Sequence, residues 1–271
     1  MTDAPRPYPW RTFWILTLAG TLTGPLVLPY FLGLQATAPY PPPISGSLQV
    51  LVMVVLARNF VILGIAAGLG LLVARRIGLG APYLEHRFDD APPPAEPLVS
   101  IVKPAVLWAT VTALIAFAID TLFLHGFGVE FPAPEIHARI DVAWWRSGLA
   151  SLWAPFGEEI VDRLFLLSLL AWLGMKLFRV KGEGRGRTVA LWTANVATAL
   201  FFGWYHIGNE QLFAEVVPAI VAWRTVLIIF PVGLAFGWLY WKRGLEAAIL
   251  SHFVIDVIVH VVRPLVEGWM A

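Results

Sequence analysis

The chain alternates between long apolar runs and short polar segments. A helix needs about 20 mostly apolar residues to cross the hydrocarbon layer of a membrane. The runs that meet this length predict an all-α, polytopic membrane bundle of about seven transmembrane helices, and they form one integral membrane domain over residues 1–271. The predicted spans are about Phe13–Leu34, Leu48–Ala74, Leu98–Leu124, Ala154–Leu177, Thr188–His206, Val216–Trp241 and Leu245–Leu265.

Composition agrees with this pattern and excludes several classes of protein. Hydrophobic residues make up 58% of the chain and charged residues 14%, whereas soluble domains carry roughly 25% charged residues. We therefore expect a multi-pass protein of the cell membrane, with the lipid bilayer as a partner. The net charge of +1 offers no basic surface for a nucleic acid. The absence of cysteine excludes disulfides, thiolate metal sites and a cysteine nucleophile.

Lysine and arginine gather in alternate connecting segments, which predicts the orientation of the chain. The segments Gln35–Ser47 and Ile207–Glu215 contain neither residue. Because Lys and Arg favour cytoplasmic loops, the amino terminus is expected inside and the carboxyl terminus outside. The loop after the third span is an exception, since it contains Arg139 and Arg146. The basic segments hold Arg6, Arg11, Arg75, Arg76, Arg87, Lys181, Arg185, Arg187, Lys242 and Arg243.

Two connecting segments have their own patterns. Leu84–Pro97 is polar and rich in proline, so it predicts an extended connector without regular structure. Ala138–Trp153 has tryptophans and an arginine beside apolar residues. That pattern is typical of an amphipathic helix at the membrane surface, and it would lead into the fourth span through Pro155.

Four ionisable residues stand together at the start of the fourth span: Glu158, Glu159, Asp162 and Arg163. An ionised side chain at the centre of a membrane helix costs roughly 2.5–3.5 kcal/mol on insertion scales, so such residues need partners. Glu159 and Arg163 are four residues apart, in the order that favours an ion pair. Glu158 points about 100° away from Glu159 and needs a different partner. Asp162 has no evident partner, and we expect it to face a loop or the interface.

Two later spans supply histidines at helical spacing. Phe202 and His206 share one helix face, as do His252 and Asp256. If Arg163 neutralises Glu159, Glu158 is left to face a cavity shared with the two histidines. A carboxylate in such a pocket can act as a general base, and an imidazole can hold a water or donate to an oxyanion. Water attack on an amide is the expected reaction, because no GxSxG motif or Ser/Lys pair supports a covalent mechanism.

The three motifs together resemble a known family. FGEEIVDRLF, FFGWYH and SHFVID are similar to the EExxxR, FxxxH and HxxxN/D motifs of the CPBP family. These are intramembrane proteases related to the CAAX prenyl endopeptidases (the Abi family) and to bacteriocin-processing or bacteriocin-immunity proteins. The resemblance covers about Pro155–Val262, within a catalytic core at about 150–265.

The resemblance implies a glutamate-based intramembrane endopeptidase. In it, Glu158 and His206 would activate the water, and His252 with the residue at position 256 would stabilise the oxyanion. Asp256 stands where relatives often have asparagine, and an ionised Asp cannot donate to an oxyanion. It would have to be protonated, or serve only to orient His252. Supporting roles fall to Glu159, Arg163 and Phe202.

The sequence leaves open whether the reaction needs a metal and whether the protein is an enzyme. We expect a reaction without a cofactor. Glu158, His206 and His252 are also a ligand set that a divalent metal such as zinc accepts, although the HExxH arrangement is absent. Instead of an enzyme, the chain could be a non-catalytic membrane scaffold, an immunity-type protein or a transporter.

The substrate is expected to be a membrane-anchored or exported protein. Counting helix rise from the basic loops places Glu158 and His206 toward the outer face. An outward-facing site favours removal of a carboxyl-terminal sorting tag or a leader peptide. Processing of a prenylated tail is the other activity that the resemblance implies.

Overall fold

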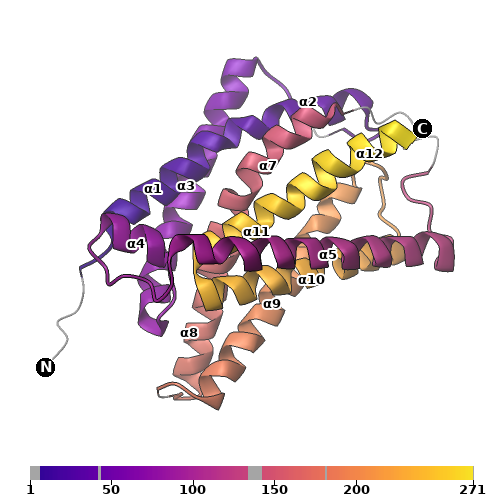
Figure 1. Ribbon diagram of the computed structural model, residues 1–271. Coiled ribbons are helices and arrows are strands. Elements are labelled where there is room, and N and C mark those ends of the chain that lie inside the picture. The colour runs from indigo at the N-terminus through magenta and orange to yellow at the C-terminus, as the bar shows by residue number, and fades with distance from the viewer. Residues whose placement is uncertain (1–6, 42–43, 134–141, 181, 271) are drawn as a thin grey trace, which may run out of the picture.

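A computed structural model describes residues 7–41, 44–133, 142–180 and 182–270, and in this part of the chain every regular element is a helix. Figure 1 shows an all-α bundle, which confirms the predicted fold class. The α-helices are α1 (Trp10–Thr23), α2 (Leu28–Thr37), α3 (Leu48–Ala74), α4 (Pro82–Phe88), α5 (Val102–Thr121), α7 (Trp144–Glu159), α8 (Ser168–Leu177), α9 (Arg185–Glu210), α10 (Ala219–Arg243), α11 (Leu245–Val257) and α12 (Arg263–Met270).

Short segments of other helix types join several of these helices into longer runs. The 3₁₀ segment η1 (Gly24–Val27) connects α1 to α2, where Pro25 interrupts the α-helical pattern. The 3₁₀ segments η2 (Arg75–Ile77) and η3 (Leu98–Ile101) end α3 and begin α5. Three π-helical segments follow α5, α7 and α11: η4 (Leu122–Gly126), η5 (Ile160–Leu167) and η6 (Ile258–Val262).

Within the described residues, five helical runs are long and apolar enough to cross a membrane, so the expected count of seven is not confirmed. The other two predicted spans correspond to α7–η5–α8 and α9, which carry the residues of the first two motifs. Their polar content makes them less apolar than the five. The five runs are Trp10–Thr37, Leu48–Ile77, Leu98–Gly126, Ala219–Arg243 and Leu245–Val266.

One of the two predictions for the connecting segments needs correction, and only in part, because residues 89–97 have no regular structure, as expected. Leu84–Phe88 is not extended, because it belongs to α4, whose amino-terminal backbone N–H groups at Tyr83 and Leu84 donate to Glu246 of α11 at 3.0 and 2.9 Å. A carboxylate at a helix amino terminus stabilises the first turn. Trp144–Trp153 is helical and leads through Pro155 to Glu159 within α7, as predicted, and its position at the membrane surface stays a prediction. Residues 138–141 lie outside the described residues.

Small residues bring α9 and α10 close together. A side chain at Gly233 would meet the Cα of Ala199 at 3.0 Å. The amide nitrogen of Asn195 donates to the carbonyl of Leu234 at 3.0 Å, a hydrogen bond across the same contact. Close approach through small residues and polar side chains is the usual way in which membrane helices associate. This contact fixes the position of the first candidate histidine relative to α10.

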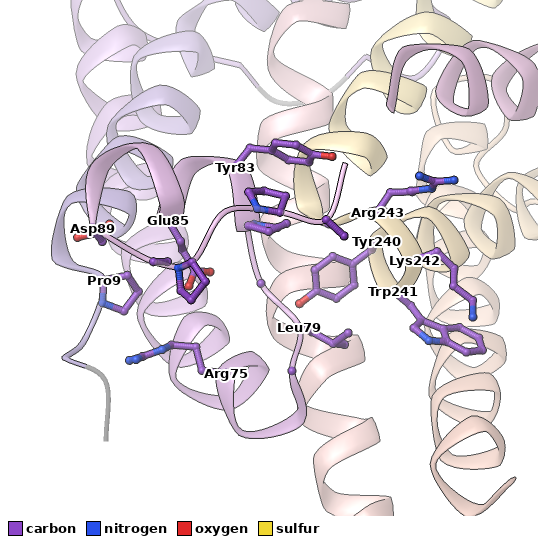
Figure 2. A pocket seen from close by; sticks show the side chains of 18 of the residues that line it. Pro9, Arg75, Leu79, Tyr83, Glu85, Asp89, Tyr240, Trp241, Lys242 and Arg243 are labelled. Atoms are coloured by element: carbon purple, nitrogen blue, oxygen red, sulfur yellow. The ribbon is translucent and has the colours of Figure 1, made fainter. Parts of the chain in front are cut away.

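A large crevice of about 1050 Å³ lies at the end of the bundle that carries the basic loops. In Figure 2, Tyr83, Glu85 and Tyr240 line it, while the side chains of Lys242 and Arg243 point away from each other. Arg243, the last residue of α10, forms an ion pair with Glu96, which lies in the segment between α4 and η3. None of the described lining residues is a histidine. No residue of the three motifs lines this crevice either.

We predict that Gly233→Ala destabilises the bundle by about 1–3 kcal/mol, because the added methyl group meets helix backbone that cannot move aside. Gly208→Ala is the matched control, since a methyl group there meets nothing within 4 Å. Thermal unfolding of the two variants in detergent measures the difference. Equal melting temperatures would show that the α9–α10 contact is looser than described.

Candidate active site

The helix with the four ionisable residues changes its geometry at the site. After Glu159, α7 passes into the π-helix η5, which ends at Leu167 before α8 begins. A π-helix is uncommon and is found frequently at functional sites. Within it, Asp162 and Arg163 are buried, at 1% and 0% exposure, as is the preceding Glu159 at 0%. The segment contains no glycine or proline, so the sequence gives no sign of this change.

The guanidinium of Arg163 is the centre of the buried cluster. Its Nε lies 3.3 Å from Glu159 Oε2, and its Nη1 lies 3.5 Å from Asp162 Oδ2. Nη2 donates to the carbonyl of Gly233 on α10 at 3.2 Å. The guanidinium also lies over the rings of Phe202 and Phe236, 4.5 and 5.4 Å from their centroids. Such cation–π contacts stabilise a cation that has been removed from water.

The two adjacent glutamates have different surroundings. Glu159 contacts Arg163 with one oxygen and accepts a hydrogen bond from His252 Nδ1 with the other, at 2.8 Å. The Glu158 side chain is 22% exposed and lines a cavity. Its Oε2 lies 3.8 Å from His252 Nε2, which is too long for a direct hydrogen bond. The structure therefore contains the expected Glu159–Arg163 pair and leaves Glu158 facing open space.

His252 is fixed on three sides. Its ring stacks on Phe236 with a centroid distance of 4.7 Å and an interplanar angle of 20°. Nδ1 donates to Glu159, so Nε2 faces Glu158 and Asp256, whose Oδ1 lies 3.7 Å away. The hydrogen bond that orients this imidazole comes from Glu159 on another helix. Asp256, one turn along α11, lies beside the ring at a longer distance.

His206 is oriented by its own helix. Its Nδ1 lies 2.7 Å from the carbonyl oxygen of Phe202, which can only accept, so Nδ1 carries the proton and Nε2 remains available. The imidazole stacks on Tyr205, with centroids 4.7 Å apart, and contacts the edge of Phe202 at the same distance. Phe202 thus touches both Arg163 and His206, which explains why an aromatic residue stands one turn before the histidine.

The expectation for Asp162 was wrong. Instead of facing a loop or the interface, it is buried between Arg163 and Tyr205, whose hydroxyl donates to its Oδ2 at 3.0 Å. Its Oδ1 has no hydrogen-bond partner among the described residues. Sequence reasoning did not single out Tyr205. The available signal was a polar aromatic residue directly before a candidate histidine inside a span.

The candidate residues line one cavity of about 510 Å³. It reaches from the motif residues toward the ends of α2, α5 and α9 that lie opposite the basic loops. An ion pair between Asp120 of α5 and Arg224 of α10 lies at its far end, with Arg263 nearby. The lining residues from the three motifs are Glu158, Phe202, His206, His252 and Asp256.

The structure gives no ready metal site at these residues. Among the described residues, no group of three or more His, Asp or Glu side chains has an arrangement that could hold a metal ion. The ring nitrogen contacts of His252 are to carboxyl groups of the cluster, and that of His206 is to a backbone carbonyl. The proposed zinc ligands thus share a cavity without converging on one point.

Comparison with known proteins finds a family that resembles the part of the chain with the three motifs. A family model described as Type II CAAX prenyl endopeptidase, Rce1-like, matches residues 140–258. This region belongs to the CPBP/CAAX protease family. The matched region contains all three motifs and covers α7, η5, α8, α9, α10 and α11. Searches of the curated proteins and of the solved structures found no match.

We predict that Arg163→Ala destabilises the protein strongly, by about 3–5 kcal/mol, because it leaves buried carboxyl groups without their cation. Arg243→Ala is the control: its pair with Glu96 is exposed, and we expect a change of no more than about 1 kcal/mol. Thermal unfolding in detergent measures both. If Arg163→Ala melts within a degree or two of Arg243→Ala, the central role of the guanidinium is contradicted.

Proposed function

We propose that the protein is an intramembrane endopeptidase that uses Glu158 and His206 to activate water against a peptide bond. The observation that supports this best is the separation of the two glutamates. Both carboxyl oxygens of Glu159 have partners, in Arg163 and His252. Glu158 instead lines the same cavity as His206, whose Nε2 is available. A carboxylate that faces a cavity beside an available imidazole nitrogen has the arrangement of a general base.

The reaction follows from these positions. Glu158 accepts a proton from a water that His206 orients, and the resulting hydroxide attacks the carbonyl carbon of the scissile bond. The carbonyl oxygen becomes an oxyanion, and its charge is stabilised by a hydrogen bond from His252 Nε2. Glu158 then gives its proton to the leaving nitrogen, and the C–N bond breaks. The products are a carboxylic acid and an amine.

This role for His252 requires its ring to be protonated on both nitrogens, because Nδ1 already donates to Glu159. The carboxylate of Glu159 balances the positive charge of such a ring. Asp256 lies 3.7 Å from Nε2 and supports the same edge of the imidazole. The Asp in place of Asn is therefore a supporting group here, and the oxyanion contact is assigned to His252.

The substrate is a membrane-associated or exported protein, and the protein acts in the cell membrane. The matched family model names CAAX prenyl endopeptidases, so a prenylated carboxyl-terminal tail is one substrate class to test. A sorting tag or leader peptide of an exported protein is the other. Two quenched fluorescent probes separate these classes: a peptide with a prenylated cysteine near its carboxyl terminus, and an unprenylated peptide attached to one membrane span.

We predict that Glu158→Ala, His206→Ala and His252→Ala each lower cleavage of the active probe at least about 100-fold, because each removes a group that acts on the water or the oxyanion. Turnover by purified protein in proteoliposomes measures this. The exposed residues His125 and Glu215 supply the control variants His125→Ala and Glu215→Gln. Wild-type cleavage by Glu158→Ala, or no cleavage of either probe by the wild type, would favour a scaffold or transporter instead.

We further propose that the reaction needs no metal, since Glu158, His206 and His252 supply the base, the water-orienting group and the oxyanion donor. Dialysis against EDTA followed by 1,10-phenanthroline is expected to leave turnover unchanged, and metal analysis of the active protein is expected to find less than one ion per chain. Loss of turnover that zinc restores would establish the metal-dependent alternative.

We infer that the site opens to the outer face, because the cavity lies at the ends of the helices opposite the basic loops. The absence of cysteine allows a direct test with single introduced cysteines. On intact cells, a membrane-impermeant maleimide is expected to label Glu215→Cys, beside the cavity end, and to spare Glu183→Cys, between α8 and α9. The reverse labelling would place the site on the cytoplasmic face.

A further inference from the structure

Asp162 is a buried carboxyl group that the proposed reaction does not use. It lies one turn after Glu158 and is 1% exposed. Burial of a carboxyl group is costly unless it is paired or hydrogen-bonded. Its two partners are the Arg163 guanidinium at 3.5 Å and the Tyr205 hydroxyl at 3.0 Å. Glu159 lies closer to Arg163, at 3.3 Å, so the guanidinium already has a nearer carboxylate.

Tyr205 connects this carboxyl group to His206 and so joins α9 to the helix that carries Glu158. It directly precedes His206 on α9, and its ring stacks on the imidazole at 26° with centroids 4.7 Å apart. Its hydroxyl donates to Asp162 on η5, the segment that continues α7 directly after Glu158 and Glu159. The ring therefore restrains the plane of His206, and the hydroxyl ties α9 to the helix that carries Glu158.

We propose that Asp162 and Tyr205 form a positioning pair that sets the distance and orientation of His206 relative to Glu158. This proposal rests on the proposed function, since it assigns a role in the same water-activating site. Catalysis by two groups on different helices depends on their separation, and an error of about 1 Å can lower a rate 100-fold. The hydrogen bond joins the two helices within one turn of each working side chain.

The competing interpretation is that Asp162 serves only as a second counter-charge for Arg163. Two substitutions distinguish these roles. Asp162→Asn removes the charge and keeps an oxygen that accepts from Tyr205, whereas Tyr205→Phe keeps the stacked ring and removes the hydroxyl. A positioning role predicts that the Asn variant stays active and that the Phe variant does not. A counter-charge role predicts the opposite order.

The experiment measures kcat and KM for Tyr205→Phe, Asp162→Asn, Asp162→Ala and the double variant Tyr205→Phe/Asp162→Ala. We expect kcat to be at least about 10-fold lower in Tyr205→Phe and in Asp162→Ala, with KM within about twofold of wild type and the double variant no worse than either. Asp162→Asn is expected to retain most of the wild-type kcat. Tyr240→Phe is the control, because it removes another buried hydroxyl, bonded to Ser168 at 2.7 Å, away from the site.

A wild-type kcat in Tyr205→Phe would overturn the positioning pair, as would separate losses that multiply in the double variant. If Asp162→Ala does not fold, Tyr205→Phe and Asp162→Asn carry the test. Glu158→Ala in the same assay separates the two proposals. If Glu158→Ala is inactive while Tyr205→Phe matches the wild type, only the pair is wrong. If Glu158→Ala is fully active, the proposed function is wrong.

A second measurement needs no substrate. In protein labelled with ¹⁵N-histidine, the ring resonances of His206, assigned by their loss in His206→Ala, are expected to move in Tyr205→Phe and to stay in place in Tyr240→Phe. A purely structural role for the hydroxyl would leave them unchanged in both variants. Unchanged His206 resonances in Tyr205→Phe would therefore also overturn the pair.

Discussion

The site depends on satisfying one buried cation. The Arg163 guanidinium is fully buried within η5, and a buried cation is stable there only if its partners surround it. Its partners come from different elements: carboxyl groups from its own helix, a carbonyl from α10, and the aromatic faces of Phe202 and Phe236. Because these groups must converge on one point, α9 and α10 are held at fixed positions against η5. The histidines follow, since His206 stands one turn after Phe202, and the His252 ring stacks on Phe236.

The contact with Arg163 gives the two adjacent glutamates different surroundings. Glu159 bridges Arg163 and His252, so it links the structural cluster to the imidazole that is proposed to stabilise the oxyanion. Glu158 points elsewhere, into the cavity that His206 and His252 also line. Two acids that are neighbours in sequence thus have separate environments, which is how one site can hold a structural carboxylate beside a reactive one.

Features set by short-range spacing could be predicted from the sequence. The helical bundle, the bounds of α3 and the Glu159–Arg163 pair follow from apolar run length and from four-residue spacing. Features set by contacts between distant segments could not. Asp162 seemed to lack a partner because Tyr205 is 43 residues away, and α4 seemed extended because Glu246, which caps it, is more than 160 residues away. The π-helix η5 could not be predicted either, since no residue type in Ile160–Leu167 indicates a π-helix.

The central claim is that Glu158 acts on the substrate and Glu159 holds the site together. Measuring both turnover and melting temperature for Glu158→Gln and Glu159→Gln tests it most directly, because the same small change is made at neighbouring positions. Glu158→Gln should lose turnover and keep a melting temperature close to that of the wild type. Glu159→Gln should melt at a clearly lower temperature, because Arg163 and His252 lose their shared charged partner. The claim would be contradicted if Glu158→Gln kept its turnover or if Glu159→Gln kept its melting temperature.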